Sequence, residues 1–234
     1  MDKILIIGAS GHAKVIIETI ELGGDYEIYG LIDSFKPKGM NVLGYEILGT
    51  EENIQDLIDQ GISKGIIAIG DNWTRLQMMN KIHSLTPDFE FVTVIHPSAI
   101  ISPSVQIGKG TIIMASVTIN ADAKVGSHCI LNTGASFGHD SVIEDFASLA
   151  PGVTIGGNVF IDYCTAICLG ANIIQAINIG KYSIVGAGSI VVNDIGDYKL
   201  AYGLPAKEKR DIEKGEQYLS GTWKSSKGKN KTDK

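Results

Sequence analysis

Three histidines beyond residue 94 could act as neutral bases near pH 7: His96, His128 and His139. His139 directly precedes Asp140, a carboxylate that could orient the imidazole and stabilise its charged form. This pair is typical of a general base, although an exposed histidine in a turn is an ordinary structural alternative. His96 precedes Pro97 and is interpreted as structural, and His128 is interpreted as a solvated turn residue.

A glycine-containing loop, Gly8-Ala9-Ser10-Gly11-His12, follows the first apolar run of the chain. Glycines let a backbone approach a phosphate closely, and the free N–H groups of the next helix can bind that phosphate. Asp33 ends the second apolar run, where a ribose-binding acid is expected. Ser10 replaces the middle glycine of the dinucleotide fingerprint, so a nucleotide other than NAD is favoured. A plain strand-to-helix turn that binds nothing stays open.

A third apolar run ends at Gly70, and a helical pattern begins at Trp73. Asp71 or Asn72 can cap this helix, but capping does not explain Arg75, a cation in the first turn that opposes the helix dipole. A bound anion beside Arg75 would offset that cost, and a solvated arginine is the alternative.

The first 94 residues alternate between short apolar runs and segments with helical spacing. The runs cover residues 3–7, 27–32, 66–69 and 90–95, and the helical segments cover residues 15–20, 54–58 and 76–82. This order predicts an α/β, Rossmann-like domain with a small parallel sheet between helices. Ligands of such sheets bind at the carboxyl ends of the strands, where the loops described above lie.

An apolar residue stands at every sixth position from Ile95 to Val191, without one polar exception. The residue two before each is usually small or β-branched, as at Ala123, and a glycine often follows, as at Gly126 and Gly156. Period six predicts one short strand and one corner per hexad, with the apolar side chain inside and the small one at the corner. This is the signature of a parallel β-helix. The phase continues through residues 175–178, so no loop is expected to interrupt the coils.

Composition excludes several classes of protein. The 234 residues are 44% hydrophobic with a mean hydropathy of +0.14, which excludes a disordered chain. Residues 1–206 hold 11 basic and 21 acidic residues, a balance of −10 that makes nucleic acid an unsuitable partner. No apolar run reaches the ~18 residues of a membrane span. Three cysteines without CxxC spacing predict reduced thiols and a cytoplasmic location.

Three parts are therefore predicted: a Rossmann-like domain in residues 1–94, a β-helix in residues 95–210, and a basic, flexible tail in residues 211–234. The tail is expected to be solvated because it is rich in Lys, Ser and Gly.

From residue 3 to about residue 210 the chain resembles the sugar-nucleotide acetyltransferases of bacterial glycan synthesis and the related sialic acid O-acetyltransferases. Several motifs carry the resemblance: Gly8-Ala9-Ser10-Gly11-His12, Ile32-Asp33, Ala68-Ile69-Gly70-Asp71-Asn72 with Arg75, Ile95-His96-Pro97-Ser98-Ala99, Leu131-Asn132-Thr133-Gly134, His139-Asp140, Ala150-Pro151-Gly152-Val153, and Gly203-Leu204-Pro205-Ala206-Lys207. The resemblance implies a left-handed β-helix, a homotrimer with sites between subunits, and acetyl-CoA as donor. No metal is expected.

The resemblance also assigns residues. It places the base on His139 and its partner acid on Asp140. It puts the oxyanion near Gly157, and relatives often carry a second histidine where this chain has Ser148. The predicted acetyl-CoA contacts are Ser148, Gly157, Leu169, Ala187 and Lys207. The predicted nucleotide-sugar contacts are Ser10, Gly11, His12, Asp33, Ser34 and Gly70, with Asn72 and Arg75 of the same motif.

The expected reaction is transfer of an acetyl group to the amino group of a nucleotide-linked amino sugar. Two alternatives stay open: O-acetylation of a sugar hydroxyl by the same base, and a non-catalytic protein that binds nucleotide sugars. A zinc-dependent carbonic anhydrase on a β-helix is disfavoured, because the three histidines are 32 and 11 residues apart rather than closely spaced.

Overall fold

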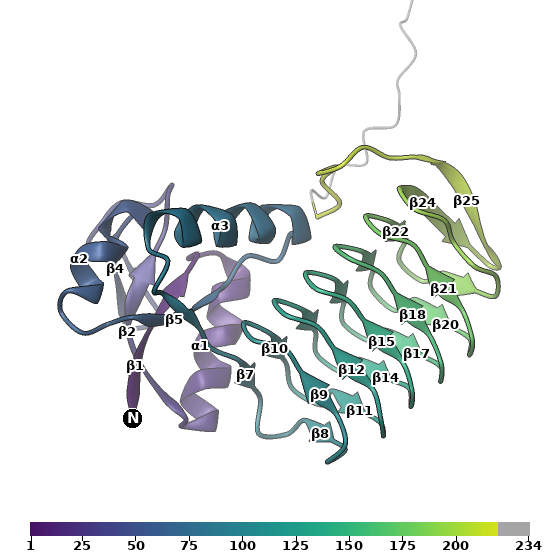
Figure 1. The fold of residues 1–234 in the computed structure, drawn as a ribbon, viewed down its shortest axis with the longest axis horizontal. Helices are drawn as coiled ribbons and strands as arrows, with labels where there is room; N and C mark the ends of the chain where they lie inside the picture. Colours follow the sequence, from purple (N-terminus) through teal and green to yellow (C-terminus); the bar gives the residue numbers. More distant parts are fainter. Residues whose placement is uncertain (220–234) are drawn as a thin grey trace, which may run out of the picture.

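The predicted α/β domain is present in the computed structural model, which describes residues 1–219 (Figure 1). Its sheet has the strand order β3-β4-β2-β1-β5-β6, and all neighbours are parallel except the β3–β4 hairpin. The strands are β1 (Asp2–Ile7), β2 (Tyr26–Ile32), β3 (Asn41–Val42), β4 (Tyr45–Gly49), β5 (Lys64–Ile67) and β6 (Glu90–Phe91). The helices are α1 (Gly11–Gly23), the 3₁₀ turn η1 (Glu51–Asn53), α2 (Ile54–Ile58) and α3 (Asn72–Leu85).

The strand order brings the predicted binding loops together. The chain runs from β1 outward to β2 and β4, and then returns to place β5 on the other side of β1. The loops after β1, β2 and β5 therefore leave the same edge of the sheet, at the point where the strand order reverses. Asp71 caps α3 by accepting a hydrogen bond from the Thr74 N–H at 2.8 Å, as predicted for this position.

Two details of the α/β domain differ from the sequence prediction. The apolar run 90–95 is divided, because β6 joins the α/β sheet whereas β7 (Val94–Ile95) is the first strand of the next domain. The β3–β4 hairpin was not predicted, because its strands are short and alternate with polar residues.

Residues 94–203 form the predicted β-helix of three parallel sheets, in which strands pair at an offset of 18 residues. The last pair is the exception, because Ile184 pairs with Leu200 at an offset of 16. The β7 sheet contains β7 (Val94–Ile95), β10 (Ile112–Ile113), β13 (Ile130–Leu131), β16 (Ser148–Leu149), β19 (Ala166–Ile167), β22 (Ile184–Val185) and β24 (Lys199–Gly203), and β25 (Ala206–Asp211) is added antiparallel at its end. The β8 sheet contains β8 (Ile100–Ile101), β11 (Thr118–Ile119), β14 (Ser136–Phe137), β17 (Thr154–Ile155), β20 (Asn172–Ile173) and β23 (Ile190–Val191). The β9 sheet contains β9 (Gln106–Ile107), β12 (Lys124–Val125), β15 (Val142–Ile143), β18 (Phe160–Ile161) and β21 (Asn178–Ile179).

The hexad explains this geometry residue by residue. The apolar residue of each strand enters one continuous core with the small residue two before it, such as Ala123 and Ala135. Every sixth residue from Gly110 to Gly188 has a positive φ, which turns the chain at a corner. The coils run without an inserted loop, as predicted. The predicted left-handed β-helix is confirmed.

Apolar contacts join the two domains into one core. The buried face of α1, including Ile16 and Ile20, packs in the same hydrophobic cluster as Ile112, Met114 and Ile130 of the β7 sheet. The first strands of the β7 sheet are thus covered by α1, whereas its later strands extend beyond the α/β domain (Figure 1).

Arg75 lies at the centre of this domain junction and is fully buried. Its guanidinium donates five hydrogen bonds: Nε to the His128 carbonyl (2.8 Å), Nη1 to those of Ile69 (3.0 Å) and Gly70 (3.1 Å), and Nη2 to the Asn72 amide oxygen (2.8 Å) and the Phe146 carbonyl (2.9 Å). The expectation of a bound anion at Arg75 is therefore wrong, because every N–H of the side chain is already used within the protein. The alternative of a solvated arginine is wrong as well, because the side chain is fully buried.

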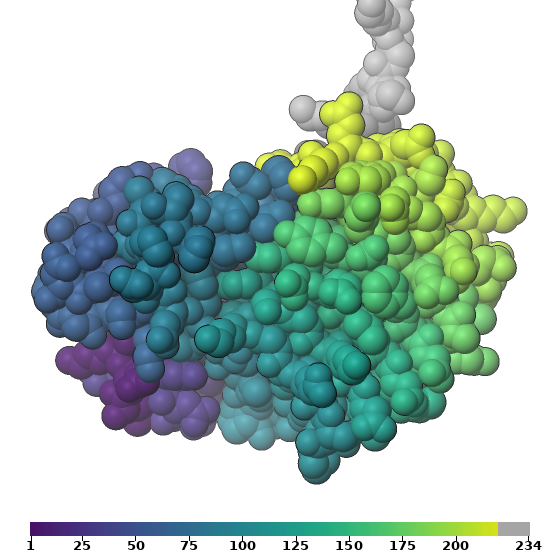
Figure 2. All heavy atoms as spheres, in the orientation of Figure 1, coloured from purple at the N-terminus to yellow at the C-terminus, as the bar shows by residue number. Residues whose placement is uncertain are grey.

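Residues 212–219, called here the return segment, were predicted to be part of a flexible tail, and this is wrong for them. After β25 they run back over the β7 sheet toward α3, as the yellow residues in Figures 1 and 2 show. Ile212 is buried against Ala166, Ile184 and Leu200. The rest of the predicted tail, residues 220–234, lies outside the described residues.

Replacing Arg75 by Lys should destabilise the protein strongly. Lysine has three donors instead of five, so at least two buried acceptors lose their partners, at about 1–3 kcal/mol each. We expect the free energy of unfolding to fall by about 3 kcal/mol and the melting temperature to fall by roughly 6 °C or more. Thermal denaturation followed by circular dichroism measures this. Arg210→Lys is the matched control, because Arg210 is an exposed partner of Glu216; an equal loss in both variants would contradict the role of Arg75.

Candidate active site

A cavity of about 890 Å³ lies where the α/β domain, the β7 sheet and the return segment meet. Five residues of the β7 sheet line it: Ile130, Leu149, Ile167, Ile184 and Leu200. Five residues predicted to bind a ligand line it as well: His12, Gly70, Ser148, Leu169 and Ala187. The first two were predicted for the nucleotide sugar and the last three for acetyl-CoA, so the structure brings both sets to one cavity.

The start of α1 provides a site for an anion beside this cavity. Ser10 is the N-cap residue, but its hydroxyl makes no capping hydrogen bond, and the first turn holds no acidic residue. A Cβ on Gly11 would meet nothing within 4 Å, so the backbone here is open to an approaching group. Free N–H groups at the positive end of a helix dipole suit a phosphate.

Asp33 and Ser34 hold the neighbouring loops in place. The Asp33 carboxylate accepts hydrogen bonds from the N–H groups of Ala9 (2.8 Å), Phe35 (2.9 Å) and Lys36 (2.9 Å). Asp33 thereby ties the loop after β1 to the loop after β2. The Ser34 hydroxyl donates to the buried carboxylate of Glu51.

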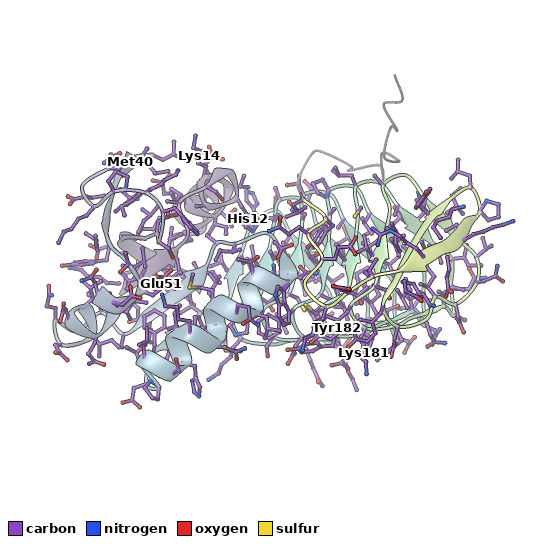
Figure 3. All side chains as sticks on the ribbon, turned by 90° about the horizontal axis from the view of Figure 1, so that it is seen from above. His12, Lys14, Met40, Glu51, Lys181 and Tyr182 are labelled. Atoms are coloured by element: carbon purple, nitrogen blue, oxygen red, sulfur yellow. The ribbon has the colours of Figure 1, made fainter. Side chains whose placement is uncertain are left out.

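His12 projects from α1 at the junction of the two domains, where Figure 3 labels it. Its Nε2 is buried and has no hydrogen-bond partner within the described part of the chain. Burial, together with the nearby positive charge of Arg75, lowers the pKa of His12 to about 4. His12 is therefore neutral at physiological pH and offers a polar nitrogen to a ligand in the cavity.

His128 was interpreted as a solvated turn residue, and this is wrong. It is only 7% exposed and stacks on Phe146, with ring centroids 4.8 Å apart and planes 7° apart. Burial and the charge of Arg75 lower the pKa of His128 to about 4. His128 is buried because its carbonyl accepts a hydrogen bond from the buried guanidinium of Arg75. This contact between the two domains was not predicted from the sequence.

His139 and Asp140 form an exposed pair at the corner between β14 and β15. The Nδ1 of His139 lies 2.7 Å from Oδ2 of Asp140, and 60% of the His139 side chain is exposed. A carboxylate only accepts hydrogen bonds, so Nδ1 carries the proton and Nε2 of the neutral ring is free to accept one. Asp140 has φ of 56°, a left-handed conformation that Asp adopts more readily than most residues.

Gly157 lies against this imidazole on the next coil. A Cβ at Gly157 would lie 2.5 Å from Nε2 of His139, so any residue other than glycine would displace the imidazole ring. Among the hydrogen bonds of the described residues, none is donated by the Gly157 N–H.

The remaining predicted contacts are spread over the structure. Leu169 and Ala187 lie at the cavity rim, on corners between the β7 and β8 sheets, and Leu169 is exposed. Lys207 lies on the exposed strand β25, away from the cavity lining. Asn72 is buried and donates to the carbonyl of Thr165 at 3.0 Å, so like Arg75 it belongs to the domain junction. Its side chain is therefore not available to a substrate.

Four residues of the return segment also line the cavity, and none was predicted as a site residue: Glu216, Gln217, Tyr218 and Leu219. The segment shows neither strand nor helix periodicity, so its position depends on contacts made only in the folded protein. The sequence did hold one sign that this segment packs against the protein: its otherwise charged residues include the apolar or aromatic Ile212, Tyr218 and Leu219.

Within residues 1–219, no group of three His, Cys, Asp or Glu side chains is arranged to hold a metal ion. No helix in the same range is long and apolar enough to cross a membrane.

The chain joins an α/β domain with an open helix N-terminus to a β-helix that carries an exposed His-Asp pair. This combination defines a class of two-domain transferase-like proteins. Comparison with known proteins specifies this class. Residues 3–82 match the family described as the PglD N-terminal domain. Perosamine N-acetyltransferase from Caulobacter crescentus, solved with CoA and GDP-perosamine, is 38% identical with a TM-score of 0.85. The similarity covers 90% of this chain and 98% of that one.

Two further relatives agree. The acetyltransferase domain of PglB from Neisseria gonorrhoeae, in complex with acetyl coenzyme A, is 31% identical with a TM-score of 0.80 over 88% of this chain and 98% of that one. UDP-N-acetylbacillosamine N-acetyltransferase from Bacillus subtilis is 40% identical over 119 residues, 49% of this chain. That match covers 52%, about half, of the curated relative. The chain belongs to the sugar-nucleotide N-acetyltransferase family.

The buried histidines predict a pH-dependent stability. In the folded protein the pKa of both His12 and His128 is about 4, against 6.5 for an ordinary histidine. Between these values the unfolded chain binds more protons than the folded one, so stability falls as the pH falls from about 6.5 toward 4. In this range each unit of pH decrease lowers the free energy of unfolding by up to about 1.4 kcal/mol per buried histidine.

His128→Phe keeps the aromatic stack on Phe146 but removes one of these groups. The loss of melting temperature between pH 7 and pH 5 should therefore shrink to about half in this variant. His83→Gln, on the exposed side of α3, is the control and should behave as the wild type. An unchanged loss in His128→Phe would mean that His128 is charged in the folded protein.

Proposed function

We propose that this protein transfers the acetyl group of acetyl-CoA to the amino group of a nucleotide-linked amino sugar. The observation that carries the proposal is the His139–Asp140 pair, with a free Nε2 above Gly157 on the exposed surface of the β-helix. The relatives solved with CoA, GDP-perosamine and acetyl coenzyme A support this choice of donor and acceptor.

His139 acts as general base in this proposal. Its Nε2 accepts a proton from the amine as the nitrogen attacks the thioester carbonyl, and Asp140 stabilises the resulting imidazolium. The new C–N bond forms, the C–S bond breaks, and the imidazolium returns a proton to the CoA thiolate that leaves. The protein thus ends the cycle in its starting protonation state.

The Gly157 N–H is suited to the developing oxyanion. It is beside His139, it makes no hydrogen bond to another described residue, and glycine lets the thioester approach closely. Leu169 and Ala187 at the cavity rim are proposed to contact acetyl-CoA, and Lys207 its phosphates. The acceptor's diphosphate is proposed to bind at the start of α1, through Ser10 and Gly11.

The site is proposed to be shared between subunits, because its parts lie on different corners of one chain. His139 is at a β8–β9 corner, whereas Leu169 and Ala187 are at β7–β8 corners beside the cavity. The β8 sheet lies between these two corners, and its outward residues are all uncharged: Ile100, Thr118, Ser136, Thr154, Asn172 and Ile190. Three copies packed through this sheet around one axis would bring His139 of each to the cavity of its neighbour.

The assembly itself can be measured. We expect a homotrimer of about 75 kDa, three times the 25.0 kDa chain, by size-exclusion chromatography with light scattering. Thr154→Arg, in the middle of the β8 sheet, should dissociate it, whereas Lys124→Arg on the β9 sheet should not. A wild-type monomer at micromolar concentration would contradict the shared site.

The general base can be isolated by His139→Ala. The side chain is exposed, so the variant should stay folded and keep its assembly, while kcat falls ~100- to 10,000-fold. KM for both substrates should change little, because the lost interaction acts in the transition state. Asp140→Asn should cost less, since the imidazole remains but is oriented less well.

The assay follows CoA release with UDP-, GDP- and dTDP-linked amino sugars, and a sialic acid as the hydroxyl acceptor. His83→Ala, on the exposed side of α3, is the control for loss of an imidazole. A folded His139→Ala protein that keeps more than about a tenth of kcat would refute the assignment of the base. Turnover with the hydroxyl acceptor alone would make the protein an O-acetyltransferase, and no turnover with any acceptor would refute the proposed function.

A further inference from the structure

Tyr218 of the return segment reaches the place where the α/β domain meets the β7 sheet. Its hydroxyl lies 3.4 Å from the Gly70 carbonyl, 3.3 Å from the Asn72 N–H and 3.4 Å from the Ser148 hydroxyl. The tyrosine is half-buried and lines the cavity together with Gly70 and Ser148.

The return segment is fixed by contacts on both domains. The Lys214 ammonium lies between Trp73 and Tyr182, 4.9 Å and 5.1 Å from the ring centroids, and a Cβ at Gly215 would lie 2.7 Å from the Trp73 indole nitrogen. Arg210 at the end of β25 also pairs with Glu216. These anchors hold Tyr218 over the cavity before any ligand arrives.

Several polar groups of the cavity lie at this end. The unpartnered Nε2 of His12 and the hydroxyls of Ser148 and Tyr218 line one cavity with the Gly70 backbone, close to the start of α1. At the other end Ile184 and Leu200 line the cavity, and there Arg210 and Glu216 are paired with each other. A diphosphate at the start of α1 would place its attached sugar beside these groups, which can supply the donors and acceptors that sugar hydroxyls need.

The Tyr218 hydroxyl is free to exchange partners. Its three contacts are at the long end of the hydrogen-bond range, whereas O–H···O bonds are usually 2.7–2.8 Å. Burial raises the pKa of Tyr218, so the phenol stays protonated and can both donate to and accept from a sugar hydroxyl. Turning its O–H from the Gly70 carbonyl to a ligand would cost little.

We propose that Tyr218 is a specificity-determining residue that hydrogen-bonds the sugar of the nucleotide-linked acceptor, an inference that rests on the proposed function. The return segment is then a wall of the acceptor site rather than a tail. Ser148 supports it from the β7 sheet, where a small side chain leaves room for the phenol.

The test compares Tyr218→Phe with the wild type, because phenylalanine keeps the ring and removes only the hydroxyl. KM for the amino-sugar nucleotide that the wild type acetylates fastest should rise about three- to tenfold, the effect of one neutral hydrogen bond. KM for acetyl-CoA should stay within about twofold. Calorimetry should show the same weakening for this nucleotide sugar, but none for the corresponding nucleoside diphosphate, which lacks the sugar.

Tyr45→Phe is the matched control, since it removes a phenol hydroxyl that bonds Glu21 on the surface of the α/β domain. It should leave both KM values unchanged. Equal weakening of the nucleoside diphosphate and the nucleotide sugar by Tyr218→Phe would overturn the proposal, and so would weakening of acetyl-CoA alone or no change at all. A wild type that acetylates and binds none of the nucleotide sugars would instead show that the proposed function is wrong.

Discussion

The buried guanidinium of Arg75 is the constraint on which the site depends. A charge without a carboxylate partner is stable in a protein interior only if each N–H meets an acceptor, and here the five acceptors come from both domains. The carbonyls of Ile69 and Gly70 belong to the α/β domain, and those of His128 and Phe146 belong to the β-helix. Their fixed positions set how the two domains meet, and thereby set the width of the cavity beside Gly70.

The β-helix contributes rigidity of a different kind. A corner every six residues repeats one backbone shape, and a side chain at a corner is displayed outward at a place that the core fixes. His139 and Asp140 use such a corner, and Gly157 one coil later leaves the imidazole its space. A side-chain pair on a coil of this type needs no loop to position it, since the pairing of strands 18 residues apart already does so.

Local patterns were sufficient to predict the α/β fold and the β-helix, because βα alternation and hexads are periodic along the chain. The catalytic role of His139 and Asp140 stays a prediction. Arg75 and His128 were misassigned from the sequence and Tyr218 was missed, and the reason is the same for all three. Each has partners far away along the chain, 53 residues for Arg75 with His128 and 148 residues for Tyr218 with Gly70. No local spacing shows that a charged, polar or tail residue will be buried by such partners. Asp33 is intermediate: its place after β2 was predictable, but its three backbone partners were not.

The two domains offer different surfaces to the two proposed substrates. The α/β domain offers positive helix-end groups suited to a diphosphate, while the β-helix offers an apolar face and an exposed base. A site between them needs a third element, because the β7 sheet beyond α1 would otherwise be open to water. The return segment covers that face through Ile212, and it reaches the junction through Lys214 and Gly215. The cavity is therefore a product of three parts of the chain, and the last of them is the part that carries the weakest sequence pattern.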